Sequence, residues 1–153
     1  MTINEEAAPA RGIWGAKEEV KFRGHPLVKS THPTTFEVTT EEHLTENGDC
    51  IIGVGADKGC SGIGEAVKEG LRRSGAKVRI RISVGELTFQ TEARGDPRLE
   101  LSHPHDIVVR RSDFASDRTL ALGASAAARD IPRQMVRLLR SPSVTGRLEI
   151  EVE

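Results

Sequence analysis

The chain has 153 residues and a formal net charge of -1, with 37% hydrophobic and 29% charged residues. This composition is typical of a globular protein and excludes a disordered chain or a membrane protein. No apolar run approaches the roughly 20 residues that span a bilayer, and the first residues lack the pattern of a signal peptide, so we expect a cytoplasmic protein with no membrane partner. The near-neutral charge and the four Phe, one Trp and no Tyr argue against a nucleic-acid-binding protein.

The length fits one domain with a sizeable core. The first residues are small, polar and proline-containing, so we expect a flexible N-terminal segment 1–15 and a single globular domain 16–153. Cys50 and Cys60 match no spacing of a metal or redox motif, and we expect both to be reduced thiols.

Alternating apolar and polar residues predict short strands along most of the domain. In the first half these are "EEVKFRG", "TTFEVTT" and, after an Asn47-Gly48 turn, "DCIIGVG". "KVRIRIS" and "ELTFQTE" follow and are separated only by Gly85-Glu86, which predicts a tight hairpin. The second half supplies "RLELS", "DIVVR", "RTLAL" and "GRLEIEVE". No internal repeat is apparent.

Two helices are predicted between these strands. Ser61 can cap the first, and Gly75 suits its left-handed stop. The second falls in "SAAARDIPRQMVRLL", where either Asp130 caps a helix with Pro132 in its first turn or the helix is kinked at Pro132. The predicted fold is α+β and β-dominated: a small, mostly antiparallel, jelly-roll-like β sandwich with two helices.

The stretch "CIIGVGADKGCSGIGEAV", from Cys50 to Val67, leads from a strand through glycines into a helix. Its glycines fit neither the G-x-G-x-x-G spacing nor the short-chain dehydrogenase variant, and the Gly85-Glu86 hairpin does not fit a Rossmann crossover. A dinucleotide site is therefore not expected. Backbone amides near Lys58 remain a candidate for holding an anion, and the alternative is that the glycines serve only packing and turning.

The histidines of "HPHD" are candidate metal ligands. His103 and His105 are two residues apart and would point to one side of an extended backbone. With Asp106 they do not complete a site unless His25 or His32 joins them from the first half. The alternative is that these are loop histidines that hydrogen-bond to the backbone. No metal site is assigned.

Arginines provide two further candidates. In "VRRSDFASDR", Arg110 and Arg118 stand among Ser112 and Asp113, a mixture that can bind phosphate or carboxylate; the alternative is a set of turn-capping aspartates paired with arginines. The last predicted helix carries arginines at helical spacing, a pattern typical of a solvated face or, less often, of a nucleic-acid contact. These arginines are Arg129, Arg133, Arg137 and Arg140.

The blocks "RGHP", "THPTTFEVT", "GDCIIGVGADK", "HPHDIVVRRSDF" and "DRTL" occur in an order and spacing that resembles the archaeal family known as domain of unknown function 371. They run from about Arg23 to Leu120, and the resemblance extends to the final strand. It implies a small, mostly antiparallel β sandwich with two helices. It implies no activity and no cofactor, because none is established for the family, and whether the protein is an enzyme stays open.

The resemblance also points to polar positions that packing alone does not require. The family has threonine where His105 stands and lysine where Arg111 stands, and the first departure weakens a metal site built on His103 and His105. The matching polar residues are Arg23, His25, Thr31, His32, Thr34, Thr35, Asp49, Asp57, Lys58, His103, Asp106, Arg110, Ser112, Asp113 and Arg118.

Three functional hypotheses follow. The first is a protein that binds a small anionic ligand, bearing phosphate or carboxylate, in one polar pocket lined by loops. The second is a non-enzymatic module that contacts protein or RNA through the arginine-striped last helix, and the third is a metal-dependent hydrolase. The residues expected in the anion pocket are Lys58, His103, Arg110, Ser112 and Asp113, with Asp57 beside them and His25 and His32 as lining.

Overall fold

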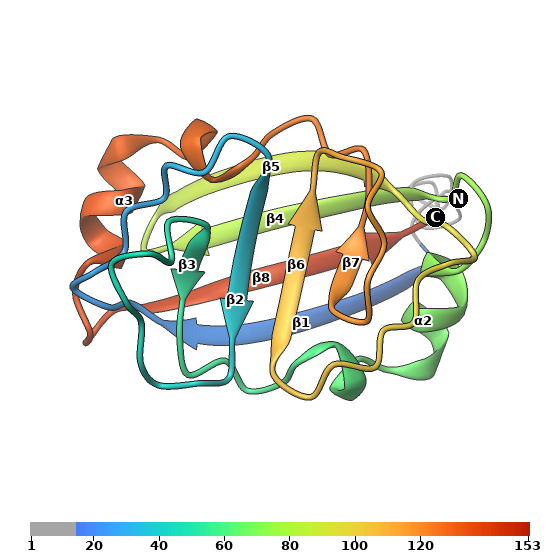
Figure 1. The fold of residues 1–153 in the computed structure, drawn as a ribbon, viewed down its shortest axis with the longest axis horizontal. Coiled ribbons are helices and arrows are strands. Elements are labelled where there is room, and N and C mark those ends of the chain that lie inside the picture. The colour runs from blue at the N-terminus through green and yellow to red at the C-terminus, as the bar shows by residue number, and fades with distance from the viewer. Residues whose placement is uncertain (1–14) are drawn as a thin grey trace, which may run out of the picture.

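The computed structural model describes residues 15–153, so the expectation of a flexible segment 1–15 lies, except for Gly15, outside the described residues. Two four-stranded sheets stack face to face, and Figure 1 shows the strands of the front sheet crossing those of the rear sheet steeply. The rear sheet, sheet A, contains β1 (Ala16–Arg23), β8 (Thr145–Val152), β4 (Lys77–Val84) and β5 (Leu87–Arg94), in that order. The front sheet, sheet B, contains β3 (Ile51–Gly53), β2 (Thr35–Thr39), β6 (Asp106–Arg110) and β7 (Thr119–Ala121), in that order.

The predicted α+β, β-dominated sandwich with two helices is confirmed. All neighbouring strands of sheet A are antiparallel, as is the central β2–β6 pair of sheet B, whereas each edge strand of sheet B runs parallel to its neighbour. The core lies between the sheets, where Phe36 and Ile107 of sheet B and Phe22, Ile80 and Ile150 of sheet A are at most 1% exposed. Because side chains alternate along a strand, Glu37 and Asp106 lie on the outer face of sheet B.

Most predicted elements are present, with two corrections. "RLELS" forms no strand; Leu99 and Leu101 are buried from a loop, and Leu101 has a φ of 53°, which no regular strand allows. Ser61 lies in a 3₁₀ turn, η1 (Cys60–Gly62), and does not cap α2 (Glu65–Leu71). The Glu18 carboxylate takes that place by accepting a hydrogen bond from the Gly64 N–H at 2.7 Å.

The Pro132 alternatives are also resolved. A 3₁₀ turn, η2 (Ala128–Asp130), ends before the proline, and a fresh helix, α3 (Arg133–Leu139), follows it without a kink. Pro132 is the N-cap residue, where its missing N–H costs no intrahelical hydrogen bond. None of the helices in residues 15–153 is long and apolar enough to cross a membrane.

The two halves of the described chain have the same fold, so the expectation of no internal repeat was wrong. The order β1-β2-β3-η1-α2-β4 is repeated as β5-β6-β7-η2-α3-β8. The pairing registers align residues 16–42 with 87–113 and residues 51–84 with 119–152. The repeats are related by a pseudo-twofold axis that passes through the pairs Glu37↔Val108 in sheet B and Arg81↔Glu149 in sheet A.

Backbone details repeat as closely as the strands. The isolated bridge between Arg23 and Val54 recurs between Arg94 and Leu122. Positive φ angles recur at Ser30 and Leu101, both 53°, and at Gly55 and Gly123, 59° and 60°. The Arg23–Glu42 ion pair has its equivalent in Arg94–Asp113. We refer below to such aligned residues as repeat mates.

Core packing differs between the repeats in a compensated way. A Cβ at Gly53 or at Gly146 would overlap the ring of Phe22. The repeat mate of Phe22 is Ala93, and the mates of the two glycines are Ala121 and Val78, so small and large residues have exchanged places. This exchange fills the same space and hides the duplication in the sequence.

Candidate functional site

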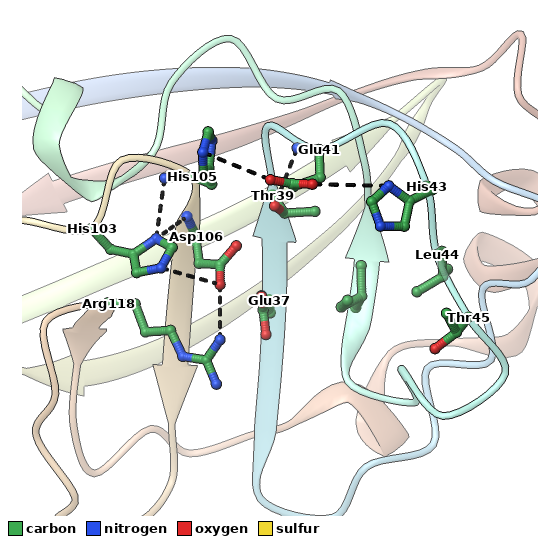
Figure 2. A pocket seen from close by; sticks show the side chains of 11 residues that line it. Glu37, Thr39, Glu41, His43, Leu44, Thr45, His103, His105, Asp106 and Arg118 are labelled. Carbon is green, nitrogen blue, oxygen red and sulfur yellow. Dashed lines mark hydrogen bonds and ion pairs between the residues drawn. The ribbon is translucent and has the colours of Figure 1, made fainter.

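A pocket of about 480 Å³ opens on the outer face of sheet B, at the end where β2 finishes and β6 begins. This volume lies within the range of small-molecule sites. Figure 2 shows its side chains converging from β2, β6, the loop after β2 and the loop before β6. We call it the acidic pocket. Its lining residues are Glu37, Thr39, Glu41, His43, Leu44, Thr45, Ile51, His103, His105, Asp106 and Arg118.

The floor of the acidic pocket is a carboxyl pair, Glu37 and Asp106. Glu37 is only 6% exposed, although it lies on the outer face, because side chains such as Cys50 and Asp106 pack around it. Burial, followed by the nearby negative charge of Asp106, raises the pKa of Glu37 to about 7, and a hydrogen bond between the two carboxyls adds to the effect. The half-buried Cys50 donates a hydrogen bond to Glu37 Oε1 at 3.6 Å. Near neutral pH Glu37 therefore holds a proton for part of the time.

Asp106 is kept ionised by its neighbours. Burial alone would raise its pKa, but hydrogen bonds from Thr39 and Arg118 and the nearby positive charges lower the pKa of Asp106 overall. Arg118 Nη1 lies 2.8 Å from Asp106 Oδ2, and this hydrogen bond raises the pKa of Arg118. The floor thus combines a carboxylic acid that titrates near neutrality with a carboxylate that stays charged, an arrangement suited to proton transfer.

His103 lies beside this pair in a fixed orientation. Its Nδ1 accepts hydrogen bonds from the backbone N–H groups of His105, at 3.1 Å, and Asp106, at 2.9 Å. In the neutral ring the proton is therefore on Nε2, which lies 3.8 Å from Asp106 Oδ2. The proline between the two histidines extends the backbone and favours this turn. His103 can donate a hydrogen bond into the pocket from Nε2.

The rim of the pocket carries a second carboxylate between two imidazoles. Glu41 Oε1 lies 3.8 Å from His43 Nδ1, and Glu41 Oε2 lies 3.7 Å from His105 Nε2 (Figure 2). His105 Nδ1 also lies 2.5 Å from the Thr40 hydroxyl. No lysine or arginine of the described residues pairs with Glu41. Its charge is thus available to a ligand that enters the pocket.

A metal centre is not what these side chains form. Within residues 15–153 no group of three His, Cys, Asp or Glu side chains has the geometry to hold a metal ion. His25, His32 and His103 each accept a backbone N–H at Nδ1, which leaves the proton on Nε2. Coordination through Nε2 would require that proton to move to the nitrogen that the amide already occupies.

Lys58 and Asp57 belong to a different part of the molecule. Lys58 Nζ lies 2.6 Å from Glu18 Oε2 of β1, and Asp57 Oδ1 accepts a hydrogen bond from Lys21 N at 3.2 Å. Burial alone would raise the pKa of Glu18, but the backbone hydrogen bond from Gly64 and the hydrogen bond and charge of Lys58 lower it overall. The ion pair fixes the glycine-rich loop to sheet A, and neither residue lines the acidic pocket.

The glycines of this loop serve close packing. A Cβ at Gly59 would lie 2.5 Å from the Pro104 carbonyl oxygen, so the loop presses against the turn that carries His103. This is the packing alternative that the sequence left open. The loop supports the wall of the pocket without contributing a side chain to it.

Arg110, Ser112 and Asp113 lie at the opposite end of β6 from His103. Arg110 Nε donates to the Thr119 hydroxyl at 2.9 Å, and its guanidinium stacks on Phe114. Ser112 Oγ accepts a hydrogen bond from Phe114 N, at 3.4 Å. Asp113 pairs with Arg94 and with Arg98, the second at 2.9 Å, so it follows the structural alternative of a paired aspartate. Within the described residues, Lys58, Arg110, Ser112 and Asp113 do not line the pocket that His103 lines.

His25 and His32 close turns. His25 Nδ1 accepts the Leu27 N–H at 3.0 Å, and His32 Nδ1 accepts the Thr34 N–H at 3.2 Å. The repeat mate of His25 is Asp96, whose carboxylate accepts the Arg98 N–H in the same way. Since an aspartate serves equally well there, the turn requires an acceptor rather than an imidazole.

Part of the arginine stripe on α3 is also committed to the fold. Arg133 donates to carbonyl groups of Lys29, Ser30, Ala128 and Ile131, and Arg140 Nε donates to the Val28 carbonyl at 3.0 Å. These arginines tie α3 to the loop after β1. All four arginines are exposed, and Arg133 and Arg140 use part of their hydrogen-bonding capacity within the fold.

A family model described as "Domain of unknown function (DUF371)" matches residues 20–153, which include both repeats and the whole acidic pocket. The chain belongs to this family. A relative, an uncharacterized protein of Methanocaldococcus jannaschii, is 40% identical over 121 residues, which cover 79% of this chain and 89% of the relative. The resemblance read from the sequence is thereby confirmed, and neither comparison names an activity.

Sequence reasoning missed the central residue of the site. Glu37 stands in the alternating strand "TTFEVTT", where alternation predicts a solvent-facing side chain, and no local signal tells that neighbouring side chains bury it. Glu41 and His43 were likewise assigned no role. A signal was available in the repeat: "THPTTFEV" and "SHPHDIVV" align, which would have placed Glu37 and Asp106 on paired strands.

Proposed function

We propose that the protein binds a small organic cation, such as an aliphatic amine, in the acidic pocket, and that Glu37 releases a proton when the cation binds. The observation that carries this proposal is the carboxyl pair at the pocket floor, Glu37 and Asp106, with a second carboxylate, Glu41, at the rim. In the acidic pocket the proposed ligand is therefore a cation and not the anion that we expected from the sequence.

The charge balance of the lining supports a cation. Three carboxyl groups line the pocket against one guanidinium, Arg118, and three imidazoles. Arg118 is already paired with Asp106, and two of the imidazoles lie beside Glu41. An anion would meet Asp106 and Glu41 without a free positive partner. An ammonium group would meet both carboxylates in a half-enclosed space where water screens their charges less than at the surface.

Proton release follows from the environment of Glu37. Its carboxyl group is protonated part of the time at neutral pH, because burial and Asp106 both favour the uncharged form. A cation placed nearby stabilises the carboxylate, so the proton leaves to solvent and the ligand remains an ammonium. His103, which presents Nε2–H beside Asp106, lies at the pocket surface where the proton can exit.

Isothermal titration calorimetry tests this proposal with putrescine at pH 6.5 in two buffers of different ionisation enthalpy. Binding with a buffer-dependent enthalpy that reports proton release is expected for the wild type. Glu37→Gln should bind without proton release, and Asp106→Asn should bind at least about tenfold more weakly, which corresponds to about 1.4 kcal/mol.

Ligands of the same length but different charge, and a variant outside the pocket, serve as controls. The compounds 1,4-butanediol and succinate have the same four-carbon chain with neutral and negative ends, and neither should bind the acidic pocket. Glu86→Gln, in the exposed β4–β5 turn, should bind putrescine as the wild type does. Equal binding of putrescine by the wild type and Asp106→Asn, or no binding by the wild type, would contradict the proposal.

A further inference from the structure

The pseudo-twofold axis places a second polar region on the outer face of sheet B, at the other end of β2 and β6. In the acidic pocket the key positions are Glu41, His103, His105 and Asp106. Their repeat mates are, in the same order, Ser112, His32, Thr34 and Thr35. Thr39, in the acidic pocket, has Arg110 as its mate. We call this region the donor end. Its residues are His32, Thr34, Thr35, Arg110, Ser112 and Ser116.

Arg110 differs from the other half-buried arginines of the described chain. Six of these meet a carboxylate or a backbone carbonyl oxygen, whereas Arg110 meets only two hydroxyls and a phenyl ring. Its Nε and Nη2 lie 2.9 Å from Thr119 Oγ1 and 3.4 Å from Ser116 Oγ, and its guanidinium carbon lies 5.0 Å from the centre of the Phe114 ring. The other six are Arg23, Arg72, Arg79, Arg81, Arg94 and Arg118.

The positive charge of Arg110 is therefore not balanced by an ion pair among the described residues, although the charge of Glu37 acts on it from a longer distance. No carboxylate of residues 15–153 lies within 4.0 Å of its guanidinium. Burial lowers the pKa of Arg110, and the nearby charge of Arg118 lowers it further. A guanidinium has five N–H donors on three nitrogens. The contacts with the two hydroxyls use Nε and Nη2, and Nη1 remains available.

The neighbours of Arg110 also favour an anion. Thr35 lies directly opposite Arg110 in the β2–β6 register, and its hydroxyl lies 3.3 Å from that of Thr34. Since His32 Nδ1 accepts a backbone N–H, His32 has its proton on Nε2 and can only donate from that nitrogen while neutral. Hydroxyl groups and an imidazole N–H can all donate to one oxyanion beside a guanidinium.

We propose that the donor end binds the carboxylate or phosphate group of a small molecule, with Arg110 as its principal ligand and His32 and Ser112 as further donors. The site is separate from the acidic pocket, because the two lie at opposite ends of the β2–β6 pair. Phe114, 61% exposed, covers one face of the guanidinium and leaves its edge for bidentate contact.

Calorimetry with inorganic phosphate and with acetate tests this assignment at low ionic strength. The wild type should bind at least one of them, and the pair shows which oxyanion is preferred. Arg110→Gln should lose at least about tenfold in affinity, while Arg110→Lys should retain part of it. Arg81→Gln, which removes an arginine paired on sheet A, serves as the matched control and should bind as the wild type.

Ser112→Glu provides a second variant because Ser112 is exposed and the change is not expected to affect folding. It introduces the carboxylate of the repeat mate, Glu41, and should abolish phosphate binding. Unchanged binding in both Arg110→Gln and Ser112→Glu, or no binding of either anion by the wild type, would overturn the proposal. Asp106→Asn should leave anion binding intact, so this site and the acidic pocket can fail independently.

Discussion

The two ends of the outer face of sheet B have the same backbone and opposite chemistry. At one end Glu41 and Asp106 present carboxyl groups, with Glu37 at the middle of β2 lining the same pocket, and at the other end Arg110 and hydroxyl residues present donors. The turns before β2 and β6 both contain a His-Pro pair whose imidazole accepts a backbone N–H. The comparison teaches that the duplication fixes where a site can form, while a few substitutions decide the sign of its charge.

The largest expected effect tests whether the repeats are interchangeable in the core. Gly53→Ala gives β3 the side chain of its repeat mate, Ala121, but places a Cβ in the Phe22 ring. We expect a loss of about 3 to 4 kcal/mol in the free energy of unfolding by urea denaturation, the upper end of what overpacking costs.

Adding Phe22→Ala and Gly146→Val to Gly53→Ala gives all three positions the residues of their repeat mates, Ala93, Val78 and Ala121. The triple variant should recover most of the lost stability, because the repeat mates fill the equivalent space with two alanines and a valine. Ala121→Gly is the control, with a loss of about 1 kcal/mol. A triple variant no more stable than Gly53→Ala would show that the repeats do not pack alike.

The pH dependence of stability tests the acidic end. The pKa of Glu37 is ordinarily 4.5 and is raised to about 7 in the folded protein. Between these two pH values folded Glu37 keeps a proton that the unfolded chain has lost. Stability therefore falls as pH rises through this window, by about 2 to 3 kcal/mol, and the loss is complete above pH 7.

Glu37→Gln should remove this fall, so the difference between variant and wild type should grow from pH 4.5 to pH 8. Urea denaturation at five or six pH values measures it. Glu86→Gln, in an exposed turn, should give a curve parallel to that of the wild type. Parallel curves for Glu37→Gln as well would mean that Glu37 titrates normally.

A pair of repeat mates compares the two ends directly. Asp106→Ala leaves Arg118 without its carboxylate and should cost about 2 kcal/mol, less than for a fully buried pair because the site is partly open to water. Thr35→Ala, at the equivalent position, removes only a hydroxyl contact and should cost about 1 kcal/mol or less. Equal losses in denaturation experiments would contradict the difference in charge between the ends.

The smallest effect concerns the turn histidines. His25→Asp installs the acceptor found at its mate, Asp96, and should change stability by no more than about 0.5 kcal/mol. His25→Ala removes the acceptor and should cost about 1 kcal/mol. Thermal unfolding of both variants measures the difference, and a larger loss in His25→Asp than in His25→Ala would mean that the imidazole itself is required.

The sequence predicted the strands better than the site, for a physical reason. Alternation identifies β4, β5 and β8 because one face of each is buried in the core and the other is solvated. Alternation cannot tell that a side chain on the outer face of sheet B is also buried, which is why Glu37 was overlooked. Lys58 was selected as a ligand because no local pattern reveals that Glu18, forty residues earlier, lies 2.6 Å away.

The duplication was missed because the strands that carry it differ most. Phe22 and Ala93, or Gly146 and Val78, differ in size, since each residue compensates for its neighbours on the paired strand and in the opposite sheet. The common signals lie in turns, where "RGHP" matches "RGDP" and a glycine of positive φ recurs at Gly55 and Gly123. Turn geometry restricts residue type, whereas core volume can be shared in many ways.

The most direct test of opposite chemistry at the two ends is a pair of NMR titrations on one ¹⁵N-labelled sample. Putrescine is expected to shift the amide signals of residues 40–45 and 103–106, and phosphate those of residues 32–35 and 110–119, with little overlap between the two sets. If both ligands perturb the same residues, or if neither perturbs the loops around sheet B, the assignment of a cation site and an anion site to the two ends is wrong.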